Sequence, residues 1–130
     1  MSPKIQNCGV NMAESLPPEL QQQVIKYQQL QTQLNQVLAE RSLLEQELRE
    51  INRALEILKN VPDNIDIYRS AGHLLIKVNK NDAEKELSER KELLELRLKT
   101  LSRQESLIRQ QLADVQSKLS QYVSSVYKKT

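Results

Sequence analysis

Apolar residues recur every three or four positions along two long segments of the chain, from Leu20 to Leu58 and from Leu87 to Val126. This spacing places them on one face of a helix, and a surface helix of ordinary length does not sustain it over about six heptads. The region between the segments instead alternates around Gly72 in the manner of a β-hairpin. The pattern therefore predicts two coiled-coil arms joined by a small sheet.

The heptad register leaves few polar residues in the predicted seam between the arms. With Leu34 and Leu98 at position a, ten of the twelve a and d positions are apolar in each arm. The polar exceptions are Gln23, Arg41, Lys91 and Glu105. We interpret Gln23 and Lys91 as ordinary seam defects. For Arg41 and Glu105 two interpretations stay open, a pair that sets the register or long side chains that extend to solvent.

The connection between the arms is only about twenty residues long, which favours a second helix folded back on the first. We expect a mainly α fold, a long antiparallel two-helix coiled coil with a central β-hairpin. The expected bounds are 17–60 for the first helix, 65–78 for the hairpin and 80–127 for the second helix. Together they form a single domain, 16–130, after a flexible N-terminal extension, 1–15. Asn79 is slightly favoured over Asn81 as the cap of the second helix.

The predicted hairpin has an apolar face with little of its own chain to cover it. A two-residue turn at Gly72 and His73 leaves Arg69 as the only charged member of that face. Because a lone two-stranded hairpin is marginal in water, we expect other hairpins to complete the sheet. The residues expected in this assembly are Ile65, Ile67, Tyr68, Ala71, Gly72, Leu74, Leu75, Ile76 and Val78.

Composition and charge narrow the class of protein. With 38% hydrophobic and 28% charged residues, the chain supplies a seam between helices but not a globular core. Its net charge of +2 comes from 19 basic and 17 acidic residues interspersed along the chain, which disfavours nucleic-acid binding. No 18-residue apolar run or signal-peptide core is present, and Cys8 is the only cysteine. We therefore expect a cytoplasmic protein without a membrane segment.

Catalytic chemistry is not indicated by any motif. His73 is the only histidine and has no cysteine or second histidine as a metal partner, so we interpret it as a polar turn residue. The chain also lacks a glycine-rich phosphate loop and a nucleophile with a nearby base. We expect no enzymatic activity, no cofactor and no metal.

The arm ends remote from the hairpin, which we call the tip, combine glutamines with apolar residues. Between Gln21 and Gln36 there are eight glutamines and one charged residue, Lys26. Two interpretations stay open: a weak, adaptable surface for nonpolar segments of other chains, or a wider seam that closes the tip. The tip residues are Leu16, Leu20, Val24, Tyr27, Tyr122, Val123, Val126 and Tyr127.

Two stretches carry a resemblance to a known family. They are LPPELQQQVIKYQQLQTQLNQVLAER at 16–41 and IYRSAGHLLIKVNKNDAEKEL at 67–87. The chain resembles β-class subunits of prefoldin, of the archaeal type, over about residues 16–126. The more specific part is the Tyr68-x-x-x-Gly72 hairpin between arms of equal length, and a single hairpin resembles the β class. Residues 1–11 precede the family-like start, so translation from Met1 and from Met12 both stay open, and Cys8 is given no role.

The resemblance implies a chaperone subunit that works without ATP. It would hold non-native polypeptides at the tips and pass them to a group II chaperonin. The implied assembly is a hexamer of two α-class and four β-class subunits, whose hairpins build an inter-subunit β-barrel. A structural tether or spacer without client binding is the alternative, and an RNA-binding helical hairpin is a third hypothesis that the balanced charge disfavours.

Overall fold

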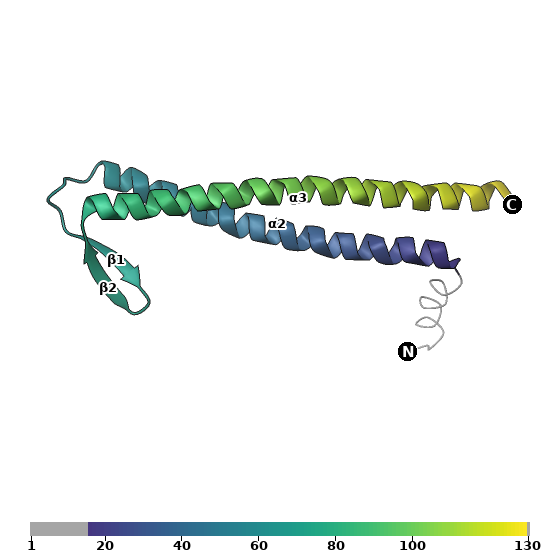
Figure 1. Cartoon of the computed structure of the whole chain (residues 1–130), viewed down its shortest axis with the longest axis horizontal. Coiled ribbons are helices and arrows are strands. Elements are labelled where there is room, and N and C mark those ends of the chain that lie inside the picture. The colour runs from purple at the N-terminus through teal and green to yellow at the C-terminus, as the bar shows by residue number, and fades with distance from the viewer. Residues whose placement is uncertain (1–15, 130) are drawn as a thin grey trace. The chain divides into compact units, whose positions relative to one another are not determined.

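The described part of the chain is mainly helical with one small hairpin, as the sequence pattern predicts. A computed structural model describes the backbone of residues 16–129 and the side chains of residues 16–126. The elements follow in the order α2 (Pro18–Lys59), β1 (Ile67–Ala71), β2 (Leu74–Val78) and α3 (Lys80–Lys129) (Figure 1). Helix α2 is thus one residue shorter than expected at each end, and α3 runs two residues past 127. The expected extension 1–15 lies outside the described residues.

Local signals account for the starts of both helices. The carbonyl of Pro17 accepts a hydrogen bond from the Leu20 backbone N–H at 2.9 Å. Pro18 stands at the first helical position, where a missing N–H costs nothing. At the start of α3 the side-chain oxygen of Asn79 accepts from the backbone N–H of Asp82 at 3.0 Å. Asn79 is therefore the N-cap, which confirms the slightly favoured choice.

The chain divides into two compact units. The tip unit comprises the described residues up to Val37 and from Gln104 onward, and the hairpin unit is Leu38–Arg103. Each unit contains one stretch of α2 and one of α3 packed antiparallel. The single domain expected over 16–130 stays a prediction.

The helix seam within each unit follows the predicted heptads. All twelve predicted seam positions in α2 are buried or half-buried, and in α3 only Val126 is exposed. Leu101 in the hairpin unit is 0% exposed, and Val115 is the most buried residue of the tip unit. The heptad prediction is thereby confirmed, because a shifted register would have brought other positions into the seam.

Two of the three charged residues expected in the seam, Arg41 and Glu105, have partners one turn away. Arg41 Nε donates to Glu45 Oε1 at 2.8 Å, and Arg109 Nε donates to Glu105 Oε2 at 2.9 Å. These intrahelical pairs are of the i, i+4 kind that stabilises exposed helices. The pairing of Arg41 with Glu105 stays a prediction.

The hairpin has the predicted register and turn. Strands β1 and β2 are antiparallel, and the pairing of Ala71 with Leu74 leaves Gly72 and His73 as a two-residue turn. Gly72 has φ of +62°, and it is the only described residue with positive φ. Glycine at the first central position is the requirement of a type II′ turn. The register puts Ile67, Arg69 and Ala71 on one face and Tyr68 and Ser70 on the other, as expected.

The cover that the chain itself gives to the apolar face of the hairpin is limited to the base of the hairpin. Figure 1 shows the hairpin leading into the start of α3. Ile67 and Val78 are half-buried and line a pocket together with Ala83 and Leu87 of that helix. Arg69 forms an ion pair with Glu86 of that helix. The cover ends at the outer half of the hairpin, where Leu74 and Ile76 are exposed. Ile65 precedes β1 and lies in a turn, with its N–H donated to the Pro62 carbonyl at 3.3 Å.

The link between α2 and the hairpin is tied to the start of α3 by one lysine. Lys80 Nζ donates to the Val61 carbonyl at 2.7 Å and lies 3.3 Å from a carboxylate oxygen of Asp63. The side chain of Lys80 is mostly covered, which strengthens these contacts relative to exposed ones. The hairpin unit therefore has a defined connection as well as a packed seam.

Candidate functional site

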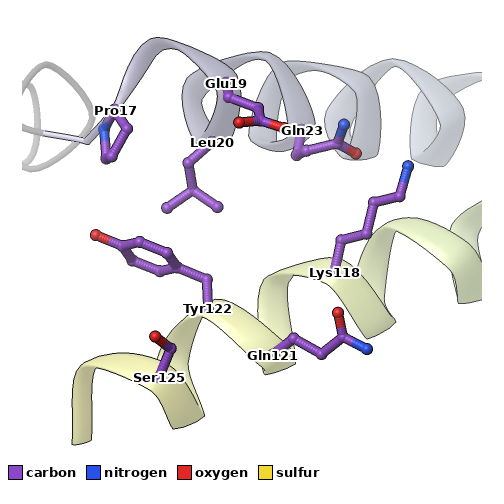
Figure 2. Close-up of a pocket in the computed structure, with 8 residues that line it drawn as sticks. All are labelled: Pro17, Glu19, Leu20, Gln23, Lys118, Gln121, Tyr122 and Ser125. Carbon is purple, nitrogen blue, oxygen red and sulfur yellow. The ribbon is translucent and has the colours of Figure 1, made fainter. Parts of the chain in front are cut away.

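The tip unit contains a groove between the start of α2 and the end of α3. Its volume is about 490 Å³. Figure 2 shows Leu20 and Tyr122 pointing toward each other from the two helices, and Lys118 reaching from α3 toward α2. The residues that line the groove are Pro17, Glu19, Leu20, Gln23, Lys118, Gln121, Tyr122 and Ser125.

The groove has an apolar floor and a polar rim. Leu20 and Tyr122 occupy seam positions and supply the floor, because their side chains face the opposite helix (Figure 2). One acidic and one basic side chain, Glu19 and Lys118, flank them, so the formal charges of the lining balance. Such a surface suits an uncharged partner with both apolar and polar groups.

The predicted tip residues fall into three groups. Leu20 is buried, and four others are half-buried: Leu16, Val24, Tyr27 and Tyr122. Val123 and Val126 remain exposed, by 50% and 43%. The backbone of Tyr127 belongs to α3, but its side chain lies outside the described residues.

The half-buried tip residues help to hold the two helices together. The Gln116 side-chain amide donates to the Tyr27 hydroxyl at 3.5 Å, across the seam of the tip unit. At the very start of α2, the Gln21 side-chain amide donates to the Leu16 carbonyl at 2.8 Å. The tip is thus a closed seam in part, and of the tip residues expected from the sequence only Val123 and Val126 are left exposed, in addition to the groove.

The hairpin unit presents a second candidate surface. Leu75 is 74% exposed, and Leu74, Ile76 and Tyr68 are also exposed, on both faces of the hairpin. Large apolar side chains on a two-stranded sheet with free edges are typical of a surface that pairs with another chain. At the base of the hairpin a pocket of about 300 Å³ opens beside Ile67, Val78 and Leu87.

Two ion pairs link the helices on the surface of the hairpin unit. Arg97 binds both carboxylate oxygens of Glu40 at 2.9 and 3.0 Å. Arg90 binds both oxygens of Glu47 at 3.0 Å. The hydrogen bond to Glu40 raises the pKa of Arg97, and the bond to Glu47 raises that of Arg90. These two-pronged contacts favour one register of α3 against α2.

Metal binding and membrane insertion find no support in the described residues. No group of three or more His, Cys, Asp or Glu side chains within residues 16–126 is placed to hold a metal ion. Within the same part of the chain, neither helix has a stretch apolar enough to span a bilayer.

Sequence reasoning missed several residues that shape these surfaces. Glu19, Lys118, Gln121 and Ser125 line the groove although none was expected there. The heptads place Glu19, Lys118 and Ser125 at position g, next to the seam, whereas Gln121 at position c carries no such signal. On the hairpin unit, the exposed Leu43, Leu93 and Leu96 were likewise not singled out.

Comparisons with known proteins agree with this architecture. A family model described as prefoldin subunit matches residues 21–125. Prefoldin subunit beta of Sulfolobus acidocaldarius is 49% identical over 116 residues, 89% of this chain and 93% of the relative. Prefoldin subunit beta of Saccharolobus islandicus is 51% identical over 116 residues, 89% of this chain and 92% of the relative.

Two solved structures of prefoldin subunits also match this chain. The crystal structure of the prefoldin beta subunit from Thermococcus strain KS-1 matches with a TM-score of 0.74 at 31% identity. It covers 82% of this chain and 93% of that one. The prefoldin beta2 subunit from the same strain has a TM-score of 0.64 at 23% identity, covering 70% and 97%, which supports the fold alone.

Proposed function

Because this chain belongs to the prefoldin family of chaperone subunits, we propose that it holds non-native polypeptides at its tip without ATP. The observation that carries the proposal is the uncovered apolar surface of the tip unit. Val123 and Val126 are exposed on α3, the helix from which Tyr122 and Ser125 line the groove. Burial of apolar client surface there is favourable by about 25 cal/mol per Å².

Holding by one tip is weak, and we propose that assembly strengthens it. The expected partners are an α-class subunit and further β-class subunits, in a hexamer of two α and four β. The exposed hairpin leucines, Leu74 and Leu75, support this part of the proposal, because such side chains favour pairing with other hairpins in an inter-subunit barrel. Several tips that contact one client then act together through effective concentration. Release to a group II chaperonin completes the proposed role.

The alternative is a structural tether that uses the same arms as a spacer and binds no client. The two proposals differ in what they require of the tip. A tether needs only the buried seam, whereas a holding chaperone also needs the exposed valines. The apolar groups left uncovered at Val123 and Val126 favour the chaperone.

Suppression of aggregation by the assembled protein tests the proposal. Reduced, denatured lysozyme is diluted into buffer without ATP, and light scattering is followed with wild-type protein and with Val123→Ser plus Val126→Ser. We expect the double variant to need several-fold more protein for equal suppression. The matched control is Leu93→Ser plus Leu96→Ser, which removes exposed apolar groups from the hairpin unit of the same helix. Absence of suppression by the wild type would favour the tether, and equal suppression by wild type and both double variants would show that Val123 and Val126 do not hold the client.

A further inference from the structure

One polar atom in the tip unit is buried without a hydrogen bond. The side-chain oxygen of Gln23 has no partner and is the only such side-chain atom among the described residues. A buried acceptor left unpaired is destabilising, since it has lost its water without replacement. Gln23 stands at a seam position where a leucine would pack without this cost. Its presence therefore needs an explanation beyond the stability of the seam.

The position of Gln23 connects this acceptor to the groove. The residue lines the groove together with Leu20, one turn earlier on α2 (Figure 2). The last torsion of a glutamine side chain is broad and roughly two-fold, so rotation about it can present the buried oxygen to the groove. The groove thus offers one unsatisfied acceptor beside an apolar floor.

Size and charge restrict what can occupy this site. A volume of about 490 Å³ lies within the range of about 300 to 1,000 Å³ that is usual for ligand sites. Glu19 and Lys118 balance each other, which favours an uncharged occupant over an acidic or a basic one. The occupant must also donate one hydrogen bond and bury an apolar group.

We propose that the groove binds an extended, uncharged segment of a non-native polypeptide, which donates a backbone N–H to Gln23 and places an apolar side chain against Leu20 and Tyr122. This inference rests on the client binding proposed above. It adds a chemical basis for the choice of client. In a folded protein nearly every backbone N–H is already paired, whereas an extended non-native segment offers free N–H groups whatever its sequence. Gln23 thereby distinguishes unfolded from folded chains.

The experiment removes the acceptor from the protein and the donor from the ligand in turn. The probe is an acetylated and amidated seven-residue peptide with a central leucine, prepared with and without N-methylation of that leucine. Its binding to the assembled full-length protein is measured by fluorescence anisotropy. For wild type we expect the N-methyl group to weaken binding about tenfold, the factor that corresponds to a hydrogen bond of about 1.4 kcal/mol. Gln23→Met should bind both peptides alike.

A neighbouring glutamine supplies the control. Gln22→Met changes an exposed residue that does not line the groove, and it should keep the tenfold preference. The inference is overturned if wild type binds both peptides equally, if Gln23→Met keeps the preference, or if the peptide does not bind. Thermal unfolding gives a second readout, in which Gln23→Met should melt at a higher temperature than wild type. A failure of the chaperone proposal would be seen separately, in the lysozyme assay with Val123→Ser plus Val126→Ser.

Discussion

At the scale of single residues, Gly72 carries the tightest backbone requirement in the described chain. Its φ of +62° is a conformation that residues with a Cβ avoid. A Cβ built at Gly72 would meet no atom within 4 Å, so space around the turn is not what excludes other residues. The requirement is conformational, and it sits at the point that reverses the chain from β1 to β2.

We therefore expect Gly72→Ala to destabilise the hairpin by about 1 to 2 kcal/mol. The matched control is His73→Ala, in the same turn but with a negative φ, which should change stability little. Urea unfolding of the assembled protein, followed by circular dichroism, measures the difference. Equal midpoints for the two variants would show that the turn tolerates a Cβ.

Leu101 is the residue on which the seam of the hairpin unit depends most. It is 0% exposed, whereas Leu96 on the same helix is 63% exposed. Leu101→Ala should cost about 2 to 5 kcal/mol of unfolding free energy, because it removes buried methyl groups and leaves a cavity. Leu96→Ala should change it by less than about 0.5 kcal/mol. Thermal denaturation of both variants checks the contrast, and similar losses of stability would show that Leu101 is not packed in the seam.

At the scale of elements, the surface ion pairs and the apolar seam have different roles. The seam supplies most of the free energy, whereas exposed ion pairs usually contribute little. Arg97 and Arg90 nevertheless each bind a carboxylate with two parallel hydrogen bonds, to Glu40 and Glu47. Because Glu40 and Glu47 lie seven residues apart, as do Arg90 and Arg97, a shift of one helix along the other breaks both pairs.

The pair of Glu40 with Arg97 makes a prediction about pH. The hydrogen bond from Arg97 is the main cause that lowers the pKa of the Glu40 carboxyl; partial desolvation opposes it, and the charge of Arg97 adds to it. A carboxyl with a lowered pKa stabilises the folded state above its unfolded pKa of about 4.3, and this contribution is lost as pH falls through the folded value. Glu40→Gln should therefore destabilise the protein near neutral pH and cease to differ from wild type in acid.

The unfolding midpoints of wild type and Glu40→Gln, measured from about pH 7 down to about pH 2, test whether the destabilisation disappears in acid. Glu50→Gln is the control, since it alters an exposed carboxyl of the same helix. A destabilisation by Glu40→Gln that persists unchanged in acid would mean that the amide disturbs packing and that the ion pair is not responsible.

At the scale of the whole molecule, the hairpin is the part whose apolar side chains are least covered by the rest of the chain. The base of the hairpin is covered by α3, but Leu75 and the neighbouring apolar side chains are exposed. A sheet of two strands with free edges is marginal in water and prone to pair with other strands. This is the physical basis for expecting the chain to act within an assembly.

A charge on the uncovered part of the hairpin should prevent that assembly. We expect Ile76→Asp to shift the protein to smaller species and to leave its helix content mostly unchanged, because burial of an unpaired carboxylate is costly. Asn64→Asp adds the same charge in the turn before β1 and should assemble normally. Sizing chromatography with circular dichroism gives both readouts. An unchanged elution volume for Ile76→Asp would contradict assembly through this face.

Particular residues show how far sequence reasoning reached. The heptads identified nearly every buried position of the seam, and Gly72 and Asn79 marked a turn and a cap that the structure contains. These features depend on neighbours within a few residues or on a repeated period. The groove around Gln23 and the pair of Arg69 with Glu86 were not predicted. They depend on how two segments far apart in the chain meet.

By itself, the amino-acid sequence determined the two helices, the hairpin with its register and the side of each helix that is buried, because periodicity, glycine and caps act locally. Only the tertiary structure decided which tip residues remain exposed and which carboxylates pair with arginines of the other helix. It alone decided that Gln23 has a buried oxygen without a partner. The reason is physical: exposure and pairing are properties of two packed surfaces, and a one-dimensional pattern describes each surface without its partner.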